Sequence, residues 1–271
     1  MSGRVRHRSN RNWNHQRTLA SIARETASSL AADSPILAVF KQAASRLTER
    51  QDRHERLVKL SRDITIESKR IIFLLHSPLT KEATAKTVQE ANGRLQKLIH
   101  GPIMLIGLEL ENCPAYLHSK AVTAGFQEFI EARTLYTCIE SKSIISYEEA
   151  QKEFIYEVLD GEGNKRQLIT MLPHIDYVLG LADLTGELMR KAINSISNGD
   201  SEDCYHSCQV VRQLYSGYLG LFGVAKELAR KMGTTRANVC KVEAAIYALS
   251  VRGGEASPAA LAVSASRWED A

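Results

Sequence analysis

The chain has 271 residues, 44% of them hydrophobic, which is enough to bury a full core but short for two domains of ordinary size. Its net charge of +4 comes from residues 1–30, where six arginines face the single acid Glu25, so the rest of the chain is close to neutral. No run approaches the ~18 apolar residues of a membrane span, and the polar N-terminus lacks the apolar core of a signal peptide, so we predict an intracellular protein without a membrane partner.

The cysteine content also indicates an intracellular protein. There are five, an odd number without a CxxC pair, which favours reduced thiols in the cytosol or nucleus over a disulfide framework. Cys204, His206 and Cys208 have the residue types of a zinc site, but no fourth ligand is evident, so ordinary side chains explain them better. We therefore predict a cytoplasmic and nuclear protein.

The two ends of the chain differ from its middle. Residues 1–33 mix Arg, Ser, Asn and His with few large apolar groups, which predicts a disordered basic tail. Such a tail serves as a nuclear-import signal or a non-specific handle on nucleic acid, or has neither role. Residues 34–255 are predicted to form one folded domain, and residues 256–271, small and polar, a frayed C-terminal tail.

The domain begins with two patterned helices. Asp33 or Ser34 is expected to cap the first, which has Pro35 in its first turn. In the second, which runs to His76, the residues that recur at helical spacing on one face are Leu57, Leu60, Ser61, Ile64, Ser68, Ile71 and Leu75. Basic residues occupy the other face, at Arg56, Lys59, Arg62, Lys69 and Arg70. A basic face can bind phosphates, but it is more often the solvated side of a helix.

Two acids stand out on a later helix. A helix from Lys81 is expected to stop at Gly101-Pro102, and the next, from Tyr116 to about Ser141, is apolar almost all round and therefore central. Glu128 and Glu131 fall within its apolar stripe, which contains Leu117, Ala121, Ala124, Ala132, Leu135 and Ile139. Burying an unpaired carboxylate is costly, and no Lys or Arg lies three or four residues from either acid. The pair therefore needs a cation, a basic partner or a proton, which favours a functional role.

The helix Ile175–Ile196 carries a second acidic pair. Its apolar face contains Tyr177, Val178, Leu181, Leu184, Leu188 and Ala192. Asp183 and Glu187 point the other way, in a stripe with Asp176, Gly180 and Asn194, and Gly180 and Gly186 leave space for another backbone or a ligand. Taken alone, this stripe fits a solvated face on which Glu187 bridges Lys191.

The remaining segments complete an all-α prediction. A short helix starts at Tyr147, a surface turn covers residues 160–164, and helices are predicted over 205–219, 224–232 and 237–251, with a turn at Gly233–Thr235. There is no strand pattern of more than a few residues, no GxGxxG, no phosphate loop and no nucleophile elbow, which argues against dinucleotide enzymes and serine hydrolases. We predict a single all-α domain of about seven helices.

The four carboxylates Glu128, Glu131, Asp183 and Glu187 suit one oxygen-rich site if their two helices face each other. Magnesium prefers such hard ligands and keeps waters that can be activated. We therefore predict a Mg²⁺ site that acts on a phosphodiester. A non-catalytic helical subunit that binds nucleic acid or protein is the rival interpretation, and a metal enzyme for another phosphate ester is a third.

Three long runs resemble the translin family. They are RLVKLSRDITIESKRIIFLLH, VLGLADLTGELMRKAINSISNGD and KVEAAIYALSVRGGE, spread over residues 55–255. The resemblance implies a translin-type domain that assembles with translin into a hetero-oligomer and binds single-stranded RNA, with DNA as a further ligand. It also implies a Mg²⁺-dependent endoribonuclease that helps to clear passenger strands in RNA silencing.

The family's motifs place the site residues. QEFIEA, residues 127–132, implies metal ligands at Glu128 and Glu131, and DLTGE, residues 183–187, implies a third ligand at Glu187. By the same resemblance Asp183 is a ligand or a base. The rival in these terms is a partner subunit that stabilises translin without catalysis.

Overall fold

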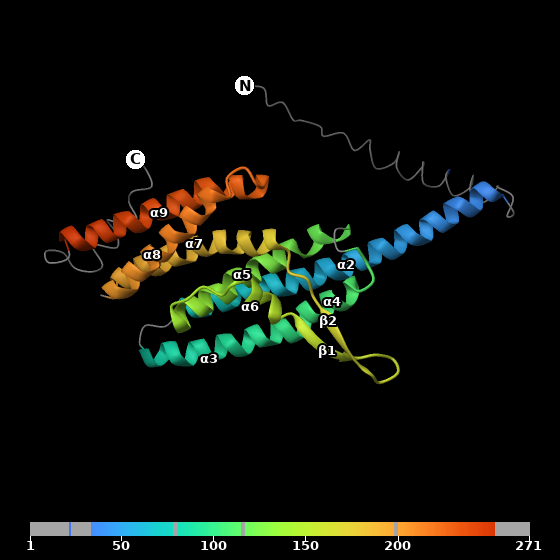
Figure 1. Ribbon diagram of the computed structural model, residues 1–271, viewed down its shortest axis with the longest axis horizontal. Coiled ribbons are helices and arrows are strands. Elements are labelled where there is room, and N and C mark those ends of the chain that lie inside the picture. Colours follow the sequence, from blue (N-terminus) through green and yellow to red (C-terminus); the bar gives the residue numbers. More distant parts are fainter. Residues whose placement is uncertain (1–21, 23–33, 78–80, 115–116, 198–199, 253–271) are drawn as a thin grey trace, which may run out of the picture. The chain divides into compact units, whose positions relative to one another are not determined.

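The computed structural model describes residues 22, 34–77, 81–114, 117–197 and 200–252 (Figure 1). The predicted tails, residues 1–33 and 256–271, lie outside the described residues, Ile22 excepted. Contacts divide the chain into two compact units, Met1–Arg53 and His54–Ala271, which are described separately. None of the described helices combines the length and the apolar character that crossing a membrane requires.

Helix α2 (Pro35–Leu75) is continuous where the sequence predicted two helices. The predicted start is confirmed, because the Leu37 amide donates to Ser34 Oγ at 3.5 Å. The second unit begins within α2, at His54. From there the predicted apolar face is buried at Leu57, Ser61, Ile64, Ser68, Ile71 and Leu75, and Leu60 is partly buried.

The next helix is interrupted by a kink. Helix α3 (Lys81–Leu98) passes through a π-helical turn, η1 (Ile99–Ile103), into α4 (Met104–Leu110). The predicted break at Gly101-Pro102 is confirmed, because Gly101 has non-helical backbone angles, although α4 follows the break directly. Pro102 has no amide hydrogen to donate, and Gly101 takes up the distortion at φ −110° and ψ −107°. The chain kinks at this wider turn and resumes as α4.

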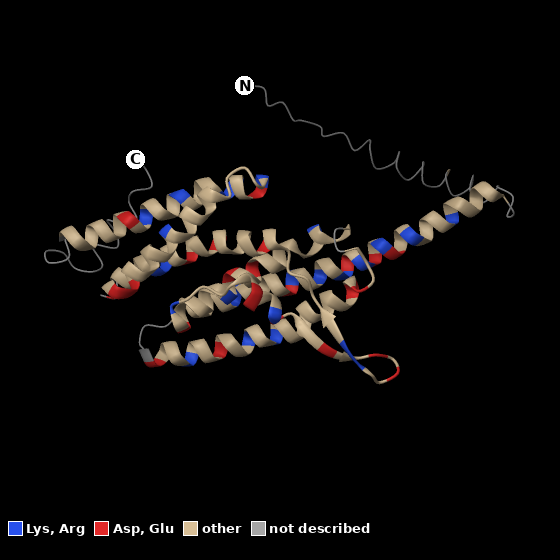
Figure 2. Cartoon of the chain, viewed as in Figure 1, with Lys and Arg blue, Asp and Glu red and all other residues tan. Residues whose placement is uncertain are grey.

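Helix α5 (Ser119–Ser141) leads through α6 (Tyr147–Lys152) to a hairpin that the sequence analysis missed. Strands β1 (Ile155–Leu159) and β2 (Lys165–Ile169) pair antiparallel, with Ile155 opposite Ile169 and Leu159 opposite Lys165. At the predicted turn, Asp160 Oδ1 accepts hydrogen bonds from the amides of Glu162 and Asn164. The acids at this turn stand beside basic residues of β2 in Figure 2. Strands of five residues are too short to show a clear alternation.

The rest of the chain is helical: α7 (His174–Ser197), α8 (Ser201–Gly220) and α9 (Lys226–Arg252). The predicted turn at Gly233–Thr235 is wrong, because α9 continues through it. One glycine costs a helix about 1 kcal/mol, which packing offsets here. Thr235 and Asn238 are buried, and Asn238 Nδ2 donates to Thr185 Oγ1 of α7 at 3.0 Å. If α3, η1 and α4 count as one bent helix, the described residues form seven helices, as predicted.

The helices of the second unit pack around α5 and α7. Helix α7 contacts α5, α8 and α9, and α3 also contacts α5 (Figure 1). The largest fully buried side chains include Phe126 and Phe129 of α5, which contact Phe154. The expectation that α5 is central is confirmed.

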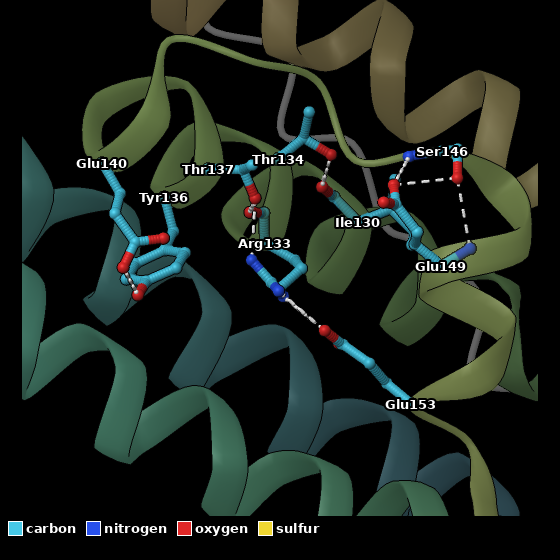
Figure 3. A network of polar contacts seen from close by, with 9 residues as sticks. All are labelled: Ile130, Arg133, Thr134, Tyr136, Thr137, Glu140, Ser146, Glu149 and Glu153. Atoms are coloured by element: carbon cyan, nitrogen blue, oxygen red, sulfur yellow. Dashed lines mark hydrogen bonds and ion pairs between the residues drawn. The ribbon is translucent and has the colours of Figure 1, made fainter.

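A polar network fixes the outer side of α5 (Figure 3). Arg133 donates to both carboxylate oxygens of Glu153, at 2.7 to 3.2 Å, and to Thr137 Oγ1. Helix α6 starts with a capping box in which Ser146 and Glu149 bond each other's backbone amides. The contacts of Arg133 hold the side of α5 that faces away from Glu131, since residues two apart lie ~200° apart on a helix.

Two glycines permit the close helix packing. A Cβ at Gly180 of α7 would stand 2.8 Å from the Gln127 carbonyl oxygen and from Ile130 Cβ of α5. A Cβ at Gly125 of α5 would meet Ser61 of α2 at 2.9 to 3.1 Å, and the Gly125 amide donates to Ser61 Oγ at 3.0 Å. The expectation that Gly180 admits another backbone is confirmed.

The contact at Gly180 can be tested by adding one methyl group. Gly180→Ala should destabilise the protein by roughly 1–3 kcal/mol despite the better helix propensity of alanine, because neither the α5 backbone nor a β-branched side chain can yield. Gly217→Ala is the control, since nothing lies within 4 Å of a Cβ there, and it should stabilise by up to about 1 kcal/mol. Urea unfolding measures both, and equal effects would contradict this account of the packing.

Candidate metal centre

One stripe of α7 faces α5. Asp176 Oδ1 accepts from Gln127 Nε2 at 2.9 Å, and its Oδ2 accepts from Thr123 Oγ1 at 3.3 Å. One turn on, Gly180 touches Gln127 and Ile130. Later residues of α7 therefore meet later residues of α5, so the two helices run in the same direction. Asp183 and Glu187 follow on this stripe at helical spacing, so Asp183 comes to the level of Glu131 and Glu187 lies one turn beyond it.

Glu131 is the buried member of the four acids, with 8% of its surface exposed. Its pKa is raised from 4.5 to about 8, first because burial disfavours the charged carboxylate, and then because Asp183, Glu128 and Glu187 add negative charge. Lys231 opposes this shift. The other three predicted acids therefore all lie within electrostatic reach of Glu131.

The other three acids each meet a cation. Glu128 pairs with Lys69 of α2 at 3.2 Å, and Asp183 pairs with Lys231 of α9. Glu187 Oε2 lies 2.7 Å from His76 Nε2 and 3.3 Å from Arg190. The predicted bridge from Glu187 to Lys191 is not formed, because Lys191 pairs with Asp203 of α8. The stripe is thus not merely a solvated helix face.

The four carboxylates are chemically suited to bind a hard cation. In this structure, however, three of them are oriented toward basic side chains. Four carboxylates, one buried and three partly buried, supply the oxygen ligands that magnesium prefers. Within the described part of the chain, no three His, Cys, Asp or Glu side chains stand together as metal ligands. Binding of a metal would require the carboxylates to turn from Lys69, Lys231 and His76 toward a shared point.

The sequence analysis missed these basic partners. Lys69 was assigned to a solvated basic face, and His76 and Lys231 were given no role. They lie more than 40 residues from the acids that they contact, so local spacing carries no signal for them. His76 had one weak cue, its position at the end of a strongly patterned apolar helix.

Comparison with known proteins identifies the family. The family model for translin matches residues 52–253, which is most of the chain. The chain belongs to the translin family. Relatives named Translin-associated protein X are 39% identical in Mus musculus, covering 82% of this chain and 81% of the relative, and 36% identical in Pongo abelii, covering 94% and 90%.

Solved structures agree on the translin fold. The structure of an AfC3PO–duplex RNA complex matches with a TM-score of 0.61 and 21% identity, over 80% of this chain and 99% of that chain. At this identity the likeness concerns the fold alone. The expected all-α translin-type fold is therefore confirmed.

The structure of this translin-family chain also tests two other expectations from the sequence, one for Asp176 and one for the possible zinc ligands. Asp176, expected on the solvated stripe, is instead buried, and burial raises its pKa, although Gln127 and Thr123 oppose that shift. Cys204 and Cys208 are buried free thiols, and His206 Nε2 lies 3.2 Å from the Lys142 carbonyl oxygen. Asp176 thus serves helix packing.

The charge around Glu131 predicts how stability depends on pH. The folded protein holds this proton more tightly than the unfolded chain does, so stability should fall as pH rises from about 4.5 to about 8, by up to about 5 kcal/mol. Glu131→Gln should flatten this fall and be more stable than wild type above pH 8. Urea unfolding in EDTA from pH 4 to 9 measures both.

The control is Glu162→Gln, on the exposed hairpin turn, which should keep the wild-type profile. A wild-type stability that does not fall over this range, or a Glu131→Gln variant that still shows the fall, would contradict the placement of Glu131.

Proposed function

We propose that this chain is the catalytic subunit of a Mg²⁺-dependent endoribonuclease that acts on single-stranded RNA in a complex with translin. The observation that carries the proposal is the buried Glu131. Burial, and then the negative charges of Asp183, Glu128 and Glu187, raise the pKa of its carboxyl. A buried carboxyl with three further acids within electrostatic reach has no evident structural use, since their charges add to the cost of its ionisation. A divalent cation offsets that cost.

The metal would be held by Glu128, Glu131 and Glu187, with Asp183 as a further ligand or as the base. When bound, Mg²⁺ supplies Lewis-acid chemistry, polarising a phosphoryl oxygen and making a coordinated water more acidic. The basic partners then acquire roles in the site. Lys69 and Lys231, released from Glu128 and Asp183, become available to bind the scissile phosphate, while His76 and Arg190 orient Glu187.

The relatives support the same chemistry. Those named Translin-associated protein X are by name associated with translin, and a solved structure with the same fold holds duplex RNA. For this chain we propose translin as partner and RNA as substrate, with DNA as a further ligand. Action in RNA silencing and a cytoplasmic and nuclear location remain predictions.

Exposed apolar side chains support assembly with a partner. Leu219, Phe222 and Val224 are exposed where α8 passes into α9, as are Tyr247 and Val251 near the end of α9. Large apolar groups gathered on a surface are typical of protein interfaces. We propose that the α8–α9 connection contributes to the translin interface.

Assembly gives one prediction. The chain expressed alone should be aggregated or self-associated by light scattering, and co-expression with translin should yield one monodisperse hetero-oligomer. Phe222→Asp should weaken that assembly by introducing a charge into the interface, and Glu162→Lys, on the hairpin turn, should not. A stable, monodisperse monomer of the chain alone would argue against an obligate complex.

Catalysis gives another. In the assembled complex, Glu128→Ala, Glu131→Ala, Asp183→Ala and Glu187→Ala should each lower Mg²⁺-dependent cleavage of single-stranded RNA more than about 100-fold, since residues that merely orient metal ligands contribute 10–100-fold. Glu140→Ala, at an exposed acid of α5, should keep wild-type activity. A fluorescently labelled RNA and a gel assay measure cleavage.

Stability separates this proposal from the rival, a non-catalytic partner subunit. Removing one acid from a cluster of like charges relieves repulsion, so the four variants should remain folded and assembled. The rival expects no cleavage by wild type, together with loss of folding or assembly when the ion pair of Glu128 is removed. Wild-type cleavage rates in Asp183→Ala and Glu187→Ala, in preparations free of other nucleases, would refute the catalytic role.

A further inference from the structure

Phe73 is the feature of α2 that neither packing nor the proposed catalytic site explains. Its side chain is 77% exposed, although it lies on a helix whose neighbouring residues Ile71, Ile72 and Leu75 are buried. Exposing a phenylalanine so fully forgoes about 2 kcal/mol of burial, so a partner for the ring is expected.

The position of Phe73 places it at the carboxylate site. Lys69, Phe73 and His76 are spaced i, i+4 and i+7, so they lie along one stripe of α2. Lys69 contacts Glu128 and His76 contacts Glu187. Phe73 is about 6 Å along the helix axis from the first and about 4.5 Å from the second. The exposed ring is therefore flanked on both sides by residues that reach the acids.

A basic groove borders the other side of Phe73. It lies between α2 and α3, has a volume of about 380 Å³, and is lined by Lys69, Arg70, Phe73, Leu74, Ser77 and Arg94. The lining contains three cations and no carboxylate. Arg70 and Arg94 both pair with Glu67, and Arg94 also lies 3.6 Å from Glu90. These ion pairs hold the guanidinium groups in place at the groove.

An exposed aromatic ring beside cations is how proteins bind single-stranded nucleic acid. Bases stack on the ring, while Lys and Arg bind the backbone phosphates. A protein interface is the other use of an exposed phenylalanine, but the fully buried centres of such interfaces are depleted of charged residues. Phe73 instead has charged neighbours at Lys69 and Arg70, both more than half exposed.

We propose that Phe73 stacks on one base of the single-stranded RNA, and that Arg70 and Arg94 bind the phosphates next to that base in the α2–α3 groove. This inference rests on the proposed nuclease function and adds to it a substrate-positioning residue outside the four acids. The stacked base lies within one or two nucleotides of the bond that is cut, because Phe73 is about one helical turn from both Lys69 and His76.

The test compares Phe73→Ala with Phe73→Trp in the assembled complex. Loss of stacking at one base typically weakens binding roughly 5- to 150-fold. Phe73→Ala should therefore raise KM for single-stranded RNA by that factor and change kcat less, while Phe73→Trp should restore KM to near the wild-type value. Leu159→Ala, at a large apolar side chain of similar exposure on the hairpin, should leave KM unchanged.

An RNA series with a single abasic nucleotide at successive positions identifies the stacked base. At one position the difference in KM between wild type and Phe73→Ala should disappear, because the base that stacks is already absent. A difference that persists at every position would refute stacking. An unchanged KM in Phe73→Ala, or loss of assembly in that variant, would also overturn the proposal, the latter by assigning Phe73 to a protein interface.

A binding measurement keeps this inference separate from the nuclease proposal. In EDTA, where no Mg²⁺-dependent cleavage occurs, RNA should quench the tryptophan fluorescence of Phe73→Trp beyond any change in wild type, whose two tryptophans are Trp13 and Trp268. Quenching without cleavage in Mg²⁺ would refute the nuclease and retain the RNA site. Cleavage without this quenching would refute the role of Phe73 alone.

Discussion

The close approach of α7 to α5 at Gly180 is the contact on which the candidate site depends. With no side chain at that position, α7 lies against the Gln127 carbonyl and Ile130, and Asp176 is tied to the same helix one turn earlier. The register of the two helices is then fixed. Asp183 and Glu187 follow at helical spacing and come within electrostatic reach of Glu131. A longer separation of the helices would leave four unrelated surface acids.

Charge rather than shape distinguishes this part of the core. Elsewhere α5 buries aromatic and aliphatic side chains, but here it buries a carboxyl whose pKa is raised first by that burial and then by the neighbouring acids. The surrounding basic groups come from different parts of the fold: Lys69 lies on α2 and His76 directly after it, Arg190 on α7 and Lys231 on α9. They limit the cost of the cluster when no metal is bound. In the proposed reaction Lys69 and Lys231 would bind a phosphate, which links the stability of the free protein to that reaction.

Helix α2 connects the core to the substrate. One face carries the predicted apolar stripe, and the Gly125 amide bonds Ser61 on that face. A neighbouring stripe carries Lys69 and Phe73, which line the α2–α3 groove, and leads to His76. Lys69 and His76 contact the acids. A single rigid helix thus fixes the distance between the carboxylates and the proposed base-stacking residue. Rigid elements position such groups more reliably than loops do.

Local patterns in the sequence determined where the helices form and on which of their faces the acids lie. The apolar face of α2 from Leu57 to Leu75, the capping box at Ser146 and the acidic residues of α5 and α7 all follow from spacings of three or four residues, which a helix converts directly into faces. Where a local signal was ambiguous, packing decided: α9 continues through Gly233, α4 follows Pro102, and a hairpin forms from two short strands.

Only the tertiary structure decided which groups meet across helices. The pairing of Lys231 with Asp183 and of His76 with Glu187 depends on how α2, α7 and α9 pack, and no spacing within one helix records it. The same holds for the exposure of Phe73, which looks like a core residue in an apolar run. Its ring faces outward because a different stripe of α2, next to the one that carries Phe73, packs against the core.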